Sequence, residues 1–396
     1  SFSPSHSVPF KLYKYFNISF RLLRNKLARG TLYLMVAELI TILSSYFIHV
    51  GLARRLGPAA YGNFGVILSI IFVTKILFLT GVTLGISKFI AEQPKQAHRW
   101  YIFGFKLQLA VIFICLLIFL FFSKSVADLL GDPSLANIIR FSSLMILGIG
   151  LYSMVKGLVN GLQMFNLQAY LESIQSVFRI IFALLLVYLG LGLFGAVTAY
   201  VIAPLLTFII ALIIMKKSVT PKLLASKSNE SNSSVQGIDK KTLLQFALPL
   251  TLYYLFFTLT TEYSLLAVKR LLADGLQTGL YTAATTLSKV TQSIFTALPL
   301  TLLPAVSSAM GQNNLILIKK YLRQSMRYGM MLILPITVLI STNAFQLLSL
   351  LYSSSYTEAA PALRILVFGF AFLTLFLTQG SFLLGINKQK TATFLT

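Results

Sequence analysis

The stretch YIFGFKLQLAVIFICLLIFLFF, residues 101–122, decides the fold class, because Lys106 is its only charged residue. A helix that crosses the hydrocarbon core of a membrane needs roughly 20 predominantly apolar residues. Strands of a transmembrane barrel would be about ten residues long and would alternate apolar and polar side chains. Since this stretch is continuously apolar, it predicts a transmembrane helix.

Comparable apolar runs occur along the whole chain. They lie at residues 32–53, 64–87, 141–161, 170–189, 192–215, 243–268, 281–303, 329–352 and 363–386, which together with residues 101–122 makes ten predicted spans. With 57% apolar and only 11% charged residues, the chain has too few charges for a water-soluble surface. We therefore predict an all-α polytopic membrane protein.

A polar segment divides the spans into two groups. Residues 216–241 contain SKSNESNSSVQ, which has little apolar content, so they predict a disordered cytoplasmic linker. The linker would join a first half with six spans, residues 31–215, to a second half, residues 242–396, with four spans and the start of another. Residues 1–30 mix aromatic and basic residues, which suits either an amphipathic helix on the anionic inner leaflet or a flexible basic tail.

The distribution of basic residues predicts the orientation. The net charge of +23 does not indicate nucleic-acid binding, because the 33 Lys and Arg residues are spread over alternate loops. Most lie on the side that holds residues 1–30 and 216–241. The opposite loops hold only Arg54, Arg55, Lys124, Arg140, Lys269, Arg270 and Arg364. The positive-inside rule therefore predicts a multi-pass protein of the cytoplasmic membrane with its N-terminus in the cytoplasm.

Redox and metal chemistry find no support in the sequence. Cys115 is the single cysteine, so no intrachain disulfide can form. The histidines His6, His49 and His98 are scattered and offer no metal-ligand spacing. We expect no metal and no cofactor.

Two pairs of segments indicate an internal repeat. ARRLGPAAYGNF, residues 53–64, has a weaker echo in VKRLLADGLQTGLYTA, residues 268–283, and NGLQMFNLQAY, residues 160–170, resembles LGINKQKTATF, residues 384–394. The second copy stops after four spans, so we expect two further helices and at least twelve spans in the full protein. Within the first segment, Gly57 and Pro58 should end the first helix.

The same motifs carry a family resemblance. The segment RRLGPAAYG at residues 54–62, together with Gly81, Gly85 and IAEQ at residues 90–93, resembles the opening of the polysaccharide-export flippases. These form the Wzx-type branch of the multidrug/oligosaccharidyl-lipid/polysaccharide exporter superfamily. The resemblance extends to GLQ at residues 161–163 and GLYTAA at residues 279–284. It implies two six-helix halves around a central cavity that moves a lipid-linked sugar from the inner to the outer leaflet.

Charged residues inside the spans are candidates for the transport pathway, because a charge at the bilayer centre costs about 2.5–3.5 kcal/mol on insertion scales. Polar residues recur at helical spacing along the eighth span and predict a face that lines water. The predicted substrate-binding residues are Lys75, Arg179, Lys289, Lys156, Thr285 and Gln292. Of these, Lys156 lies near the end of its span and either points inward or extends to the interface.

Two acids and two arginines complete the candidates. Glu262 and Glu38 lie inside spans and could bind a coupling proton or cation. The alternative for each intramembrane charge is an ion pair between helices, for example Glu262 with Lys289. Arg54 and Arg55 follow the first span, where we expect them to contact lipid phosphates.

These residues suit a flippase for a lipid-linked oligosaccharide with a phosphate or pyrophosphate, working by alternating access of two halves. No GxxxxGK[ST] motif occurs, so an ion gradient or the substrate gradient would supply the energy. The rivals are an ion-coupled drug exporter of the same superfamily, an integral membrane enzyme, and a scaffold without transport activity. The few, scattered acids argue against the enzyme. Expected partners are the lipid-linked oligosaccharide, anionic lipids, and a polysaccharide polymerase or glycosyltransferases.

Overall fold

The computed structural model describes residues 26–76, 81–218, 240–295, 306 and 315–385, and all regular secondary structure in this part of the chain is helical. Most of the predicted amphipathic segment, residues 1–30, and of the predicted linker, residues 216–241, lies outside the described residues. Most of the repeated segment at residues 384–394 also lies outside the described residues. The all-α fold class is confirmed for the described part.

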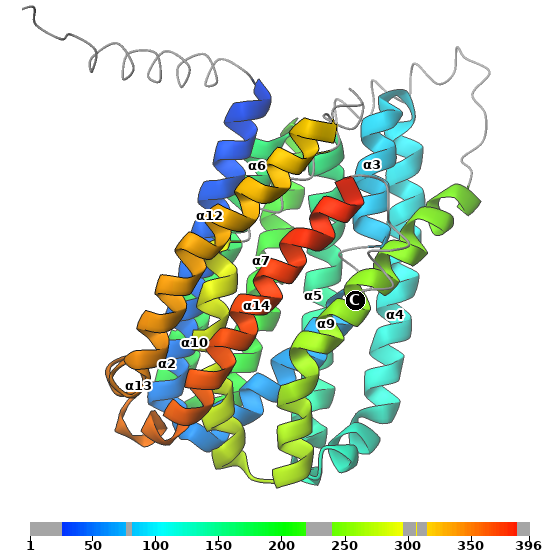
Figure 1. Cartoon of the computed structure of the whole chain (residues 1–396). Coiled ribbons are helices and arrows are strands. Elements are labelled where there is room, and N and C mark those ends of the chain that lie inside the picture. Colours follow the sequence, from blue (N-terminus) through cyan, green and yellow to red (C-terminus); the bar gives the residue numbers. More distant parts are fainter. Residues whose placement is uncertain (1–25, 77–80, 219–239, 296–305, 307–314, 386–396) are drawn as a thin grey trace, which may run out of the picture.

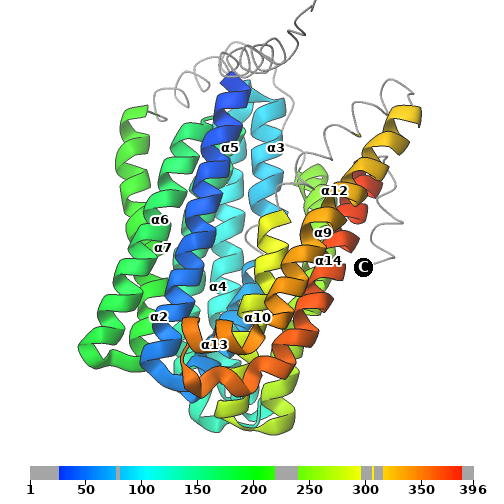
Figure 2. The same cartoon turned by 60° about the vertical axis from the view of Figure 1, so that its left-hand side comes forward.

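The helices form an elongated bundle in which most run side by side (Figures 1 and 2). Those of the first half are α2 (Lys26–Ile76), α3 (Leu84–Glu92), α4 (Ala97–Leu129), α5 (Ala136–Gly161), α6 (Phe165–Leu186) and α7 (Gly192–Ser218). Those of the second half are α9 (Lys240–Leu272), α10 (Gly275–Phe295), α12 (Leu315–Thr342), α13 (Ala344–Leu351) and α14 (Ala360–Gly385). The long helix α2 packs against α6 and α7 in the first half and against α9 and α10 in the second, so it joins the two halves.

Six stretches of the described residues are long and apolar enough to cross a membrane. They are Leu32–Glu92, Ala97–Leu129, Pro133–Gly161, Phe165–Lys217, Ile316–Thr342 and Ser354–Phe376. The first, with 61 residues, and the fourth, with 53 residues, each contain two predicted spans, so only the seventh and eighth predicted spans are missing from this set. Those two correspond to α9 and α10, which carry Glu262, Lys289 and many hydroxyl side chains.

Gly57 interrupts α2 between the first and second predicted spans. Its φ of 74° and ψ of 170° are not helical, and Pro58 follows it. A positive φ is easily adopted by glycine and strained for other residues, and proline cannot donate the hydrogen bond that would continue the helix. The predicted helix break at this motif is confirmed.

The two similar segments of the internal repeat, residues 53–64 and 268–283, touch one another at the lower end of the bundle in Figure 1. A Cβ atom placed on Gly62 would approach the backbone of Gly275 and Gly279, and one placed on Gly279 would overlap the carbonyl of Pro58. Backbone atoms cannot move aside as a flexible side chain can. Glycine is therefore required where α2 and α10 cross.

A buried lysine also links the halves at this end. Lys269 on α9 is 1% exposed, and its Nζ lies 2.7 Å from Asp132 Oδ2 and 3.0 Å from Asn63 Oδ1. Partial burial acts to raise the pKa of Asp132, but hydrogen bonds from Lys269 and Ser134 outweigh it and lower the pKa from its usual 3.8. The carboxylate therefore stays ionised and paired at neutral pH.

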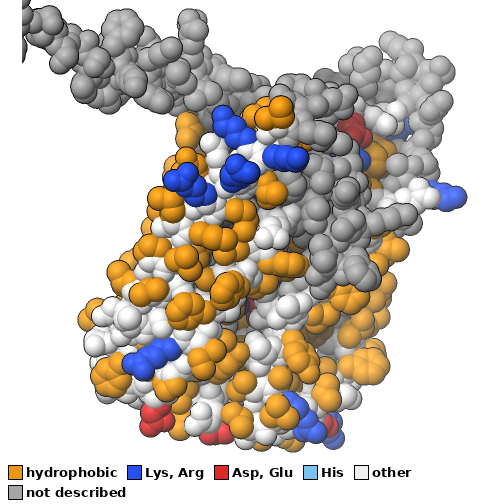
Figure 3. Space-filling model, in the orientation of Figure 1, with side chains coloured by type: hydrophobic (Ala, Val, Ile, Leu, Met, Phe, Trp, Pro, Cys, Tyr) orange, Lys and Arg blue, Asp and Glu red, His pale blue; other side chains and the backbone are white. Residues whose placement is uncertain are grey.

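The surface is arranged as a membrane requires (Figure 3). Hydrophobic side chains cover the middle of the visible face, and a group of basic side chains lies at its upper end, while both acidic and basic side chains lie toward its lower end. The exposed bases on α12 are Lys319, Lys320, Arg323 and Arg327. All four lie on the side that the sequence predicts to be cytoplasmic.

Candidate functional site

Two adjoining pockets lie within the bundle. The first, which we call the seam pocket, has a volume of about 250 Å³ and lies between the halves. Its lining comes from α2, α9 and α10 and consists of Thr41, Ile42, Ser45, Tyr46, His49, Gly65, Leu68, Ser69, Phe72, Thr261, Glu262, Leu265, Thr282, Thr285, Thr286, Lys289 and Ser293. Nine of these seventeen residues carry a hydroxyl group.

The second, the first-half pocket, has a volume of about 180 Å³ and lies entirely within the first half. Its lining comes from α2, α5, α6 and α7 and consists of Glu38, Thr41, Ile71, Phe72, Lys75, Met145, Ile149, Tyr152, Ser153, Lys156, Glu172, Gln175, Arg179, Tyr200 and Pro204. Because Thr41 and Phe72 line both pockets, the two share a wall.

In the seam pocket the two opposite charges neutralise one another. Lys289 Nζ on α10 lies 2.8 Å from Glu262 Oε1 on α9. The other carboxylate oxygen accepts a 2.6 Å hydrogen bond from Ser69 Oγ on α2. The ion pair that the sequence left open as the alternative role for Glu262 and Lys289 is present.

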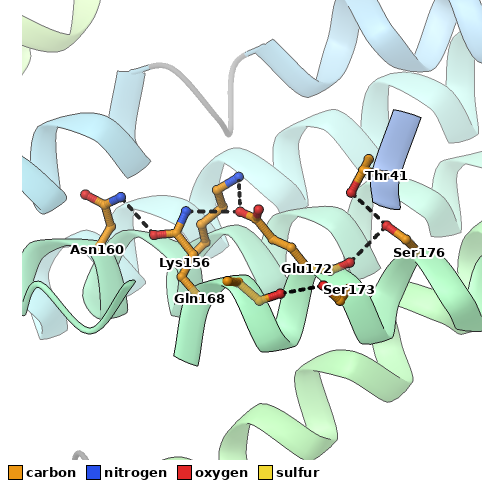
Figure 4. Close-up of polar contacts among 8 residues, drawn as sticks. Thr41, Lys156, Asn160, Gln168, Glu172, Ser173 and Ser176 are labelled. Carbon is orange, nitrogen blue, oxygen red and sulfur yellow. Dashed lines mark hydrogen bonds and ion pairs between the residues drawn. The ribbon is translucent and has the colours of Figure 1, made fainter. Parts of the chain in front are cut away.

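A polar network joins α5 and α6 at the first-half pocket (Figure 4). Lys156 Nζ lies 2.6 Å from Glu172 Oε1, which also accepts a 3.0 Å hydrogen bond from Gln168 Nε2. Gln168 Oε1 in turn accepts a 2.9 Å hydrogen bond from Asn160 Nδ2. The network fixes Lys156 against α6, so it points inward rather than to the interface.

Lys75 and Arg179 differ from Lys156 and Lys289, which both form ion pairs. Lys75 Nζ lies 3.9 Å from the centre of the Phe72 ring, and the Arg179 guanidinium lies 5.3 Å from the centre of the Tyr200 ring. Within the described part of the chain, neither makes an ion pair with a carboxylate. Both side chains line the first-half pocket, and no carboxylate among the described residues is in direct contact with either charge.

The structure distributes the remaining candidates over several places. Thr285 lines the seam pocket, and its buried Oγ1 has no hydrogen-bond partner among the residues that the structure describes. Glu38 lines the first-half pocket, away from Glu262. Gln292 is half-buried on α10 and lines neither pocket.

The two arginines predicted to meet lipid phosphates lie at the lower end. Arg54 Nε donates a 2.8 Å hydrogen bond to the carbonyl of Leu351, and its Nη2 donates to that of Leu350. Arg54 thus caps the C-terminal end of α13. Arg55 is exposed and lies over the ring of Tyr188 at 5.3 Å. Lipid contact by either residue stays a prediction.

Several lining residues were not among the predicted site residues. Glu172 shares a helical face with Arg179, which was a usable signal, but its partner Lys156 is on another helix. On α2 the polar residues Glu38, Thr41, Ser45 and His49 recur at intervals of three and four residues, which was a usable signal for a polar face. Among the described residues, no group of three or more His, Cys, Asp or Glu could hold a metal ion.

Comparison with known proteins places this geometry in context. A family model described as polysaccharide biosynthesis protein matches residues 27–310, and a model described as MatE matches residues 249–396. No curated protein matches the chain.

Solved structures share the fold. The inward-facing conformation of a multidrug resistance MATE family transporter of the MOP superfamily superposes with a TM-score of 0.74 at 17% identity, covering 91% of this chain and 86% of that one. A MATE structure in complex with MaD3S gives 0.65 at 17% identity, with 95% and 86% covered. The eukaryotic MATE transporter AtDTX14 gives 0.63 at 13% identity, with 93% and 86% covered.

Proposed function

The chain belongs to the polysaccharide biosynthesis protein family, within the multidrug/oligosaccharidyl-lipid/polysaccharide exporter superfamily of membrane transporters, and on that premise we propose that it is a flippase for a lipid-linked oligosaccharide. It would move this lipid from the cytoplasmic to the outer leaflet of the cytoplasmic membrane, with its own N-terminus in the cytoplasm. An expected protein partner is a polysaccharide polymerase or glycosyltransferase.

The observation that carries the proposal is the charge of the first-half pocket. Three bases line it, and two of them, Lys75 and Arg179, have no carboxylate partner in the described part of the chain. A charge inside a span is costly, so it needs a partner or a ligand. The phosphate or pyrophosphate of a lipid-linked sugar would supply the negative charge.

Transport would follow alternating access, in which the two halves rock around a site between them. The seam pocket lies between the halves and the first-half pocket adjoins it, so both would change exposure as the halves move. Glu262 and Glu38 remain our candidates for a coupling proton or cation.

A second candidate function is ion-coupled export of organic cations. It is favoured by the MatE match over residues 249–396 and by the acids Glu38, Glu172 and Glu262 in the two pockets. Of these acids, Glu172 and Glu262 are paired with lysines, which leaves few free carboxylates for a cationic cargo. We therefore rank it second.

Reconstituted protein distinguishes the two functions. Vesicles that contain the full chain should move a fluorescent lipid-linked oligosaccharide between leaflets, and protein-free vesicles should not. A fluorescent phosphatidylcholine serves as the control for leaks and should stay in its leaflet. Ion-driven export of organic cations without movement of the lipid-linked sugar would overturn the flippase and support the second candidate.

A further inference from the structure

We propose that the two pockets bind different parts of one substrate: the first-half pocket takes the diphosphate, and the seam pocket takes the sugars. This division rests on the proposed function, because it concerns the substrate of that same site. It assigns a ligand chemistry to each pocket.

Charge separates the two pockets. The seam pocket contains one lysine and one acid, Lys289 and Glu262, which are bound to each other, and the histidine His49, which is hydrogen-bonded to Tyr61. The first-half pocket retains two bases, Lys75 and Arg179, and one acid, Glu38, without ion-pair partners among the described residues, so its unpaired groups carry a net positive charge. An anion gains more from unpaired bases, since it does not have to break an existing ion pair.

Several hydroxyls of the seam pocket are arranged as acceptors. Thr282 donates to the carbonyl of Thr278, Thr286 to that of Thr282, and Ser293 to that of Lys289, at 2.7, 2.8 and 3.0 Å. Ser69 donates to Glu262. A hydroxyl whose proton is already donated offers only its lone pairs to a ligand.

Such a lining discriminates between the two parts of the substrate. Phosphate oxygens are acceptors, so these hydroxyls would offer them no proton. Sugar hydroxyls are donors as well as acceptors and would find partners.

The placement of the pockets fits the covalent structure of the substrate. The diphosphate is bonded directly to the first sugar, so the two subsites must touch. Thr41 and Phe72 form the shared wall. Together the pockets reach the range typical of small-molecule sites, roughly 300–1,000 Å³.

Binding measurements on the full chain in phosphatidylcholine nanodiscs test the division. The probes are a polyprenyl diphosphate without sugar and the same lipid carrying a neutral oligosaccharide. One set of variants, Lys75→Gln and Arg179→Gln, removes charge from the first-half pocket. The double variant Thr285→Val/Thr286→Val removes hydroxyls from the seam pocket and keeps the side-chain shape. Its control is Thr198→Val/Thr260→Val, because both threonines lie outside the two pockets and, like Thr286, donate to the carbonyl four residues earlier.

We expect each charge variant to weaken both probes by about tenfold or more, since a hydrogen bond to a charged group contributes about 1.5–3 kcal/mol and 1.4 kcal/mol is tenfold. Thr285→Val/Thr286→Val should lower the affinity only for the sugar-bearing lipid, and the control variant should bind both probes as the wild type does. Equal weakening of both probes by Thr285→Val/Thr286→Val would overturn the division, and so would equal affinity of the wild type for the two probes. The proposed function would survive either result. It would fail, and the division with it, if wild type bound neither probe.

Discussion

Arg54 and Lys269 lie in the two segments of the internal repeat, and each reaches across to the opposite half. Arg54, after the first span, binds the carbonyls of Leu350 and Leu351 before the tenth span. Lys269, after the seventh span, binds Asp132 before the fourth span. The two contacts are reciprocal, and both hold the halves together at the lower end of the bundle.

The Lys269–Asp132 pair should show energetic coupling. We expect Asp132→Asn to lower the thermal stability in detergent, because it leaves Lys269 buried with only the neutral partner Asn63. In a double-mutant cycle with Lys269→Met, the coupling energy should be about 0.5–3 kcal/mol. Additive effects of the two substitutions would show that the pair is not linked.

The same pair predicts a pH dependence. The pKa of Asp132 is lowered in the folded protein, so its stabilisation is fully present above the usual value of 3.8 and is lost as the pH falls through the lower folded value. The difference in melting temperature between wild type and Asp132→Asn should therefore be constant at mildly acidic and neutral pH and shrink only in strong acid. A difference that vanishes near neutral pH would contradict the assignment.

Gly279 should not tolerate a side chain. Gly279→Ala places a Cβ against the backbone of Pro58, so we expect a loss of about 1–3 kcal/mol or a displaced α10. Gly369→Ala on α14 is the matched control, because nothing lies within 4 Å of its Cβ position. It should be neutral or stabilise by about 0.5–1 kcal/mol. The measurement is the melting temperature of both variants in the same detergent.

The neighbours Arg54 and Arg55 should differ in their effects. Arg54→Gln loses hydrogen bonds to α13 and should lower stability by roughly 1 kcal/mol. Arg55→Gln should leave the melting temperature unchanged but reduce the number of anionic lipids retained in native mass spectrometry. If Arg54→Gln reduced lipid retention and left stability unchanged, the lipid-phosphate role would belong to Arg54 instead.

Local patterns predicted much of the fold. Apolar runs located the spans, Gly57 and Pro58 located the first break, and the polar stripe of the eighth span located most of the α10 residues that line the seam pocket. Each of these signals lies within one continuous segment. The length of an apolar run and the conformational preferences of glycine and proline are sufficient to recognise them.

Contacts between side chains on different helices could not be predicted from such local patterns. Lys156 lies beside Glu172 only because α5 packs against α6 at a particular rotation, which no local pattern specifies. Gln292 shows the converse, since it belongs to the polar stripe of α10 but lies outside both pockets. The division into a charged pocket and a neutral one depends on such rotations, so it appears only in the structure.

The most direct test of the flippase uses the two bases without ion-pair partners. Movement of a fluorescent lipid-linked oligosaccharide between leaflets should be measured in vesicles with equal amounts of wild type, Lys75→Gln, Arg179→Gln and the exposed control Lys124→Gln. The account predicts that the first two variants lose about tenfold or more of the rate and that Lys124→Gln retains it. Equal rates in all four proteins would contradict a role for these bases in binding the anionic headgroup.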